Sequence, residues 1–170
     1  MGHILTLPEA VARRAEVRAA GRTFVLTNGV FDLLHVGHLD YLEKARALGD
    51  YLVVGVNGDG SARALKGEAR PWAPAPERAR LLAALAPVDG VVIFEELTAV
   101  ALVRVLRPDV YAKGNDYAVR PLPEAEAVKD AGGRVALIEY RPGHSTTDLA
   151  RRIALSISPA AVDHDRDAPA

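Results

Sequence analysis

The segment RTFVLTNGVFDLLHVGHLDYLEKARALGDYLVVGVN, residues 22–57, holds two apolar runs separated by an amphipathic stretch. The runs at 22–28 and 51–57 are short, continuous and rich in strand-forming residues, as is typical of buried strands. Between them, apolar residues recur at helical spacing at Leu39, Leu42, Ala45 and Leu48, and Gly49 ends the pattern. The segment therefore predicts a strand, a helix and a second strand.

The same alternation continues along the chain. Further strands are predicted at residues 90–94, 108–114 and 134–140. Helices are predicted at 8–21, 77–87, 98–107, 123–133 and 145–157, and residues 58–76 are predicted to form a loop. Continuous apolar strands separated by helices indicate a parallel sheet covered on both faces. The expected fold is α/β, a doubly wound, Rossmann-like domain with a five-stranded parallel sheet and right-handed crossovers.

The domain organisation and location follow from length and composition. A chain of 170 residues fits one domain, which we assign to residues 1–156. Residues 157–170 have no apolar periodicity and are expected to be a disordered tail. A net charge of −1 favours neither nucleic acid nor an anionic membrane as a partner. The start, MGHILTLPEA, lacks the features of a signal peptide, and we expect a cytoplasmic protein.

Two histidines, His35 and His38, follow the first strand of the quoted segment. In doubly wound sheets, ligands bind beyond the carboxyl ends of the strands. At the start of a helix the two imidazoles project to one side, Gly37 leaves room for a ligand, and free N–H groups favour phosphate. A helix-capping His beside a half-buried one is the structural alternative, and a zinc site lacks a third ligand at suitable spacing. The pair at this position favours phosphate binding.

Other polar residues are expected at the same edge of the sheet. Ser145 and Asp148 form a capping-box-like start of the last helix, after Gly143. Lys113 and Asp116 follow the fourth predicted strand. The long loop adds charged residues, among them Asp59, Lys66 and Arg70, for which a solvated surface is the alternative explanation. One triphosphate could contact both helix starts.

The chain resembles a known family in several motifs. GVFDLLHVGH resembles the signature of the HIGH-type nucleotidyltransferases. VNGD, LKGEARP, ERARLLAALAPVD, KGNDY and STTDLARRI follow in the order seen in the D-glycero-β-D-manno-heptose 1-phosphate adenylyltransferases. The similarity covers about residues 20–153. Departures from the family pattern include Val30, Trp72 and Asn115, and the Trp72 segment could reshape the sugar pocket.

The resemblance implies ATP and Mg²⁺ as co-substrate and cofactor, a sugar 1-phosphate as acceptor and pyrophosphate as product. It implies a homodimer and a separate kinase upstream. The candidate catalytic residues are His35, His38 and Lys66. The candidate nucleotide-binding residues are Asn28, Gly29, Phe31, Asp32, Gly37, Lys113, Gly114, Ser145, Thr146 and Thr147, and the candidate substrate-binding residues are Asp59, Arg70 and Asp116. Alternatives are a glycerol-3-phosphate cytidylyltransferase, an FAD synthase or a nucleotide-binding sensor without turnover.

Overall fold

The computed structural model describes residues 2–115, 121–139, 143 and 146–157. Its strands are β1 (His3–Ile4), β2 (Phe24–Gly29), β3 (Tyr51–Asn57), β4 (Gly90–Phe94), β5 (Val110–Gly114) and β6 (Arg134–Ile138). Its helices are α1 (Leu7–Ala19), α2 (Val36–Arg46), α3 (Asp59–Lys66), α4 (Ala75–Ala83), α5 (Val100–Leu106), α6 (Ala125–Asp130) and α7 (Thr146–Ser156). The predicted alternation of strands and helices is therefore confirmed.

The strands of the described residues form one parallel sheet of order β1-β4-β3-β2-β5-β6. From β2 the chain moves outward through β3 to β4, and it then returns to the other side of β2 to form β5. The strand order therefore reverses between β2 and β5. Asn28, near the end of β2, and Lys113, near the end of β5, lie beside this switch point, where ligands bind in open α/β sheets.

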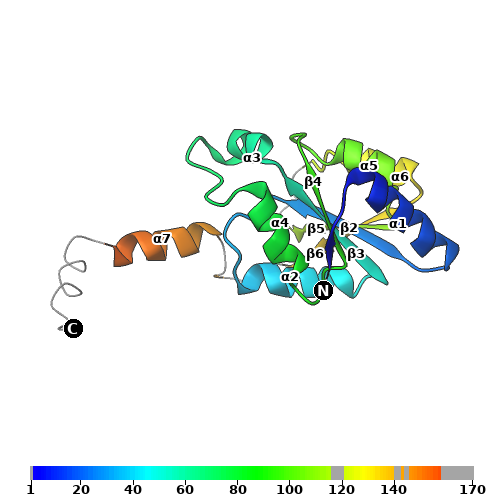
Figure 1. Cartoon of the computed structure of the whole chain (residues 1–170), viewed down its shortest axis with the longest axis horizontal. Coiled ribbons are helices and arrows are strands. Elements are labelled where there is room, and N and C mark those ends of the chain that lie inside the picture. The colour runs from blue at the N-terminus through cyan, green and yellow to red at the C-terminus, as the bar shows by residue number, and fades with distance from the viewer. Residues whose placement is uncertain (1, 116–120, 140–142, 144–145, 158–170) are drawn as a thin grey trace.

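Two hydrophobic cores lie on opposite faces of the sheet. One joins α2 and α4 to the sheet and includes Leu42, Val54 and Leu82. The other joins α1, α5 and α6 to the opposite face and includes Phe24 and Leu106. Figure 1 shows the same two groups of helices on either side of the strands. This three-layer arrangement explains why the central strands are apolar on both faces rather than alternating.

Aspartates anchor the amino ends of the central strands. Asp50 accepts from Thr23 N, Asp89 from Leu52 N and Asp109 from Phe24 N, each at 2.8 Å. These carboxylates satisfy backbone donors at the edge of the sheet opposite the switch point. The carboxyl ends of the strands carry a different set of polar groups, described below.

The fold differs from the prediction in two elements. The sheet has six strands rather than five, because His3–Ile4 forms a two-residue edge strand against Gly90 and Val91. Its residues are exposed, so no hydrophobic pattern marks it. Residues 59–66, predicted as loop, form α3 after Gly58. Asp-Gly-Ser at its start is typical of a turn, and packing of Ser61 and Ala62 onto the domain overrides that preference.

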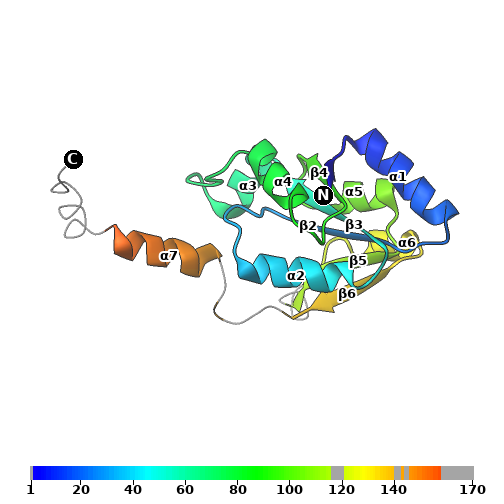
Figure 2. The ribbon, with the colours of Figure 1, turned by 60° about the horizontal axis from the view of Figure 1, so that its bottom comes forward.

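The last helix, α7, projects from the rest of the domain in two views (Figures 1 and 2). It is described from Thr146 to Ser156 and buries none of its described side chains. The tail predicted to be disordered comprises residues 157–170. Of these, Ile157 is the last described residue, and residues 158–170 lie outside the description. Across the described residues, no helix is both long and apolar enough to span a membrane.

Candidate nucleotide-binding cleft

A cleft of about 620 Å³ opens at the carboxyl ends of the central strands. Its lining comes from the carboxyl ends of β2, β3 and β5, from the loops after β2, β4 and β5, from α2, from the end of α3 and the loop after it, and from the start of α7. The predicted site residues that line it are Asn28, Gly29, Phe31, Asp32, His38, Lys66, Arg70, Lys113, Gly114, Thr146 and Thr147. Segments far apart in the sequence thus meet where the strand order reverses.

The floor of the cleft is a hydrogen-bonded polar network. Asn28 Oδ1 accepts from Lys113 Nζ at 3.0 Å and from Tyr111 Oη at 2.5 Å, which joins β2 to β5. Beside it, Tyr41 of α2 hydrogen-bonds Thr27 at 2.7 Å and donates to the Ala112 carbonyl at 3.0 Å. Lys113 is 8% exposed. A nearly buried lysine held at a cleft floor supplies positive charge at a fixed position.

The two histidines stack at the start of α2. Their ring centroids lie 3.9 Å apart at an interplanar angle of 21°. His38 lines the cleft and also contacts the Phe31 ring at 5.3 Å, whereas His35 is the N-cap residue of α2 and lies behind His38. The His38 Nδ1 atom is buried and has no hydrogen-bond partner among the described residues. Phe31 has a φ of +48°, so the loop turns sharply just before the pair.

Burial, and to a smaller extent the positive charge that His35 can carry, together lower the pKa of His38 from 6.5 to about 4. His38 is therefore a neutral imidazole at physiological pH. A neutral ring can donate one hydrogen bond to a phosphate oxygen, and it carries no positive charge that burial would disfavour.

The lowered pKa of His38 predicts a pH dependence of stability. Between the ordinary value of 6.5 and about pH 4, the unfolded chain binds a proton that the folded chain does not. The free energy of unfolding should therefore fall as the pH is lowered through this window, by a total of about 3 kcal/mol. Urea unfolding at several pH values should show a shallower decline in His38→Gln than in wild type. Equal declines in both proteins would contradict the assignment.

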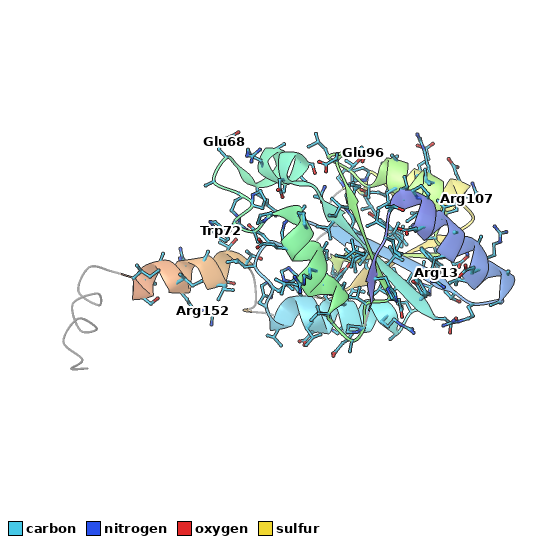
Figure 3. The ribbon with its side chains drawn as sticks, in the orientation of Figure 1. Arg13, Glu68, Trp72, Glu96, Arg107 and Arg152 are labelled. Atoms are coloured by element: carbon cyan, nitrogen blue, oxygen red, sulfur yellow. The ribbon has the colours of Figure 1, made fainter. Side chains whose placement is uncertain are left out.

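An ion pair fixes the loop after α3 against the loop after β2. Asp32, whose side chain is 2% exposed, accepts from Arg70 Nε at 2.5 Å and from Trp72 N at 2.8 Å. The Arg70 guanidinium carbon lies 3.6 Å from the Trp72 ring centroid, a cation–π contact. Figure 3 shows Trp72 on the side of the molecule from which α7 projects. Asp32 and Trp72 thus hold a cleft-lining arginine in one position.

Arg78 of α4 ties three loops together beneath the cleft. It is fully buried and donates to the carbonyls of Val30, Asn57 and Ala73. Its Nη2 also donates to Asp59 Oδ1 at 2.8 Å. The side chain therefore connects the ends of β2 and β3 with the segment that carries Trp72. From sequence alone, Arg78 could not be told apart from a solvated charge in a polar loop.

Three of the predicted site residues lie away from the cleft lining. His35 stacks behind His38, and Gly37 is buried in the first turn of α2. Asp59 directs Oδ1 to Arg78 and to Ala75 N, which fastens α3 to α4. Ser145 and Asp116 lie outside the described residues. Lining residues without an expectation from the sequence include Tyr41, Asn57, Leu97, Thr98 and Glu124, whose places depend on long-range packing.

The described part of the chain offers few ligands for a metal ion. No group of three or more His, Cys, Asp or Glu side chains gathers there with suitable geometry. The carboxylate of Asp32, in the loop before the histidines, is already bound by Arg70 and backbone N–H groups. The described side chains therefore do not form a set of ligands that could hold a metal ion by themselves.

A doubly wound α/β domain with neutral imidazole, lysine and helix N-termini around one switch-point cleft is a nucleotide-binding domain by its construction. Residues 26–156 match the family described as Cytidylyltransferase-like. The chain belongs to this family. The matched region begins within β2 and ends with α7, so it includes every segment that lines the cleft.

Curated relatives and solved structures share this region. The chain is 52% identical over 136 residues to "Bifunctional protein HldE" of Syntrophotalea carbinolica, covering 80% of this chain and 28% of that protein. The corresponding protein of Methylobacillus flagellatus is 48% identical, with 89% and 31% covered. The chain thus spans about a third or less of the length of these relatives.

The chain is similar to a solved lipopolysaccharide core biosynthesis protein from Thermoplasma volcanium over nearly the full length of that protein. It is 30% identical, with a TM-score of 0.59, and the match covers 71% of this chain and 98% of that one. A pantoate-β-alanine ligase from Francisella tularensis, solved with an ATP analogue, shares the fold at 13% identity and a TM-score of 0.59, covering 91% and 78%. The second likeness concerns the fold alone.

Proposed function

We propose that the protein transfers AMP from ATP to a sugar 1-phosphate, D-glycero-β-D-manno-heptose 1-phosphate, and releases pyrophosphate. The observation that carries the proposal is the neutral His38, stacked on His35 and facing the cleft beside Lys113 and the start of α7. The relatives, a bifunctional protein HldE and a lipopolysaccharide core biosynthesis protein, support the choice of acceptor.

The triphosphate is assigned to the part of the cleft at the switch point. There the first turn of α2 and the first turn of α7 each offer free backbone N–H groups to an anion. Thr146 and Thr147 add hydroxyl groups from α7, and Lys113 adds a cation. Ser145, outside the described residues, continues the same helix start in the sequence. We assign these residues, with Asn28, Gly29, Phe31 and Asp32 of the loop after β2, to nucleotide binding.

The acceptor phosphate is assigned to Arg70 and Lys66. Both line the cleft, and Arg70 is already held in place by Asp32 and Trp72. A phosphate monoester has its second pKa near ~6 and is mostly dianionic at neutral pH, so its oxygen attacks without a general base. The protein must bring two polyanions together and neutralise the charge that develops on the α-phosphoryl and leaving oxygens. We assign that task to His38, His35 and Lys66.

Mg²⁺ is proposed to arrive bound to the triphosphate oxygens of ATP. Magnesium commonly binds nucleotide phosphates and waters with few protein ligands, which agrees with the lack of an acidic cluster among the described residues. The ion would supply further neutralisation of the phosphate charge. The remaining site residue, Asp116, follows the described end of the loop after β5, and we keep it as a proposed substrate ligand.

The proposal is tested by a panel of nucleotides and acceptors. Purified protein is incubated with ATP or CTP and with heptose 1-phosphate, mannose 1-phosphate, glycerol 3-phosphate or FMN, and the products are identified by mass. The expected product is ADP-heptose, formed most efficiently from ATP. Efficient formation of CDP-glycerol or FAD without any ADP-sugar would overturn the proposed acceptor, and nucleotide binding without turnover would indicate a sensor.

A further inference from the structure

Glu124 presents a buried carboxylate at the wall of the cleft. The residue is 3% exposed, yet it is one of the lining residues. Its Oε1 accepts from Ala99 N, at the N-cap position of α5, at 2.8 Å. No ion pair involves Glu124 within the described ranges. An ionised carboxylate has about four acceptor positions, so one N–H leaves most of its capacity for other donors.

Although Glu124 follows β5 in the sequence, its hydrogen bond to Ala99 N holds it beside the segment that follows β4. Leu97 and Thr98, which also line the cleft, follow β4, and β4 is two strands away from β2 across the sheet. At about 4.8 Å per strand, the ends of β4 and β2 are separated by about 10 Å. The cations that line the cleft come from other segments, namely the ends of α3 and β5 and the loop after α3.

A buried carboxylate without a cationic partner repels phosphate and favours hydroxyl donors. An acceptor whose phosphate lies beneath Arg70 and Lys66 extends its carbon skeleton along the cleft. We infer that Glu124, together with the Thr98 hydroxyl, binds the hydroxyl groups at the end of the acceptor furthest from its phosphate. This inference rests on the proposed function and deepens it, because it makes Glu124 a residue that selects a heptose phosphate over a hexose phosphate.

The alternative explanation for Glu124 is that it serves only to cap α5. The variant Glu124→Gln separates the two roles, because the Gln carbonyl oxygen can still accept from Ala99 N while the negative charge is lost. Glu126→Gln is the matched control, since Glu126 lies in α6, whose N-cap residue is Glu124, and is exposed and does not line the cleft. Both variants should keep the melting temperature of wild type.

Kinetics with two acceptors test the inference. We would measure pyrophosphate release with heptose 1-phosphate and with mannose 1-phosphate, which lacks the terminal hydroxylated carbon. Glu124→Gln should lower kcat/KM for the heptose by about 10- to 100-fold, change it little for mannose 1-phosphate, and leave the KM for ATP unchanged. The preference of the enzyme for the heptose should therefore shrink. Glu126→Gln should match wild type with both acceptors.

Equal losses with the two acceptors, or no loss with either, would overturn the inference. If Glu124→Gln does not fold, Thr98→Val decides instead. It removes one hydroxyl from the same wall and should reduce the heptose preference by several-fold, and an unchanged preference would again overturn the inference. Failure of the wild-type protein to use any sugar phosphate is a separate result, and it would count against the proposed function.

Discussion

His38→Ala should lower turnover at saturating ATP by on the order of 10²–10³-fold, about 3–4 kcal/mol in the barrier. The reason is that a neutral, preorganised donor facing the cleft stabilises charge that grows in the transition state more than it stabilises bound ATP. His35→Ala should lose a smaller factor, because His35 stacks behind His38. The double variant should lose less than the product of the single effects, since both rings serve one charge.

The matched control for the pair is His3→Ala. His3 is an exposed residue of the edge strand β1, on the opposite side of β4 from the cleft strands, so its loss should leave turnover unchanged. Melting curves should be recorded for wild type and for all four variants. A purely structural histidine pair would lower the melting temperature while the folded protein kept its rate. Near-normal turnover in both His35→Ala and His38→Ala would contradict the catalytic assignment.

Arg78→Met should lower the free energy of unfolding by about 3–5 kcal/mol, the loss expected when one partner of a buried charged network is removed. The substitution leaves the carbonyls of Val30, Asn57 and Ala73 without their donor, and Asp59 without its cation. Denaturant unfolding at neutral pH measures this loss. Arg78→Lys keeps the charge but has a single nitrogen, so it should fall between wild type and Arg78→Met.

Arg80→Met is the comparison for Arg78, because Arg80 is exposed on the same helix, α4. It should change the free energy of unfolding by less than about 0.5 kcal/mol. If Arg78→Met were as stable as Arg80→Met, the proposed role of Arg78 in joining the cleft loops would be wrong. Separately, the turnover of folded Arg78→Lys measures how strongly activity depends on the positions of the loops that Arg78 joins.

The central part of the fold could be predicted because its signals are local. The apolar runs at 51–57 and 90–94 end where β3 and β4 end, since turn-forming residues follow each of them. The edge strand β1 could not be predicted, because it is two exposed residues placed by pairing with β4. Helix α3 was missed for a related reason: its sequence favours a turn, and tertiary packing determines its helical conformation.

The site was predictable where residues follow strands of a parallel sheet. Asn28 and Lys113 are 85 positions apart and still hydrogen-bond each other, because the sheet topology brings the ends of β2 and β5 together. The roles of charged residues in the long loop could not be separated in the same way. Within that loop, Arg70 lines the cleft whereas Asp59 binds Arg78. Glu124, from the connection after β5, also lines the cleft. These differences depend on side-chain contacts that have no sequence periodicity.

The most direct test of AMP transfer is to follow which phosphorus of ATP enters the product. The protein would be incubated with Mg²⁺, heptose 1-phosphate and ATP labelled at either the α- or the γ-phosphorus, and the sugar nucleotide and pyrophosphate would be separated. The account predicts that the α label appears in the sugar product, that the γ label appears in pyrophosphate, and that both signals are lost in the His35→Ala/His38→Ala double variant. Transfer of the γ label to the sugar, or release of labelled inorganic phosphate without a sugar nucleotide, would contradict it.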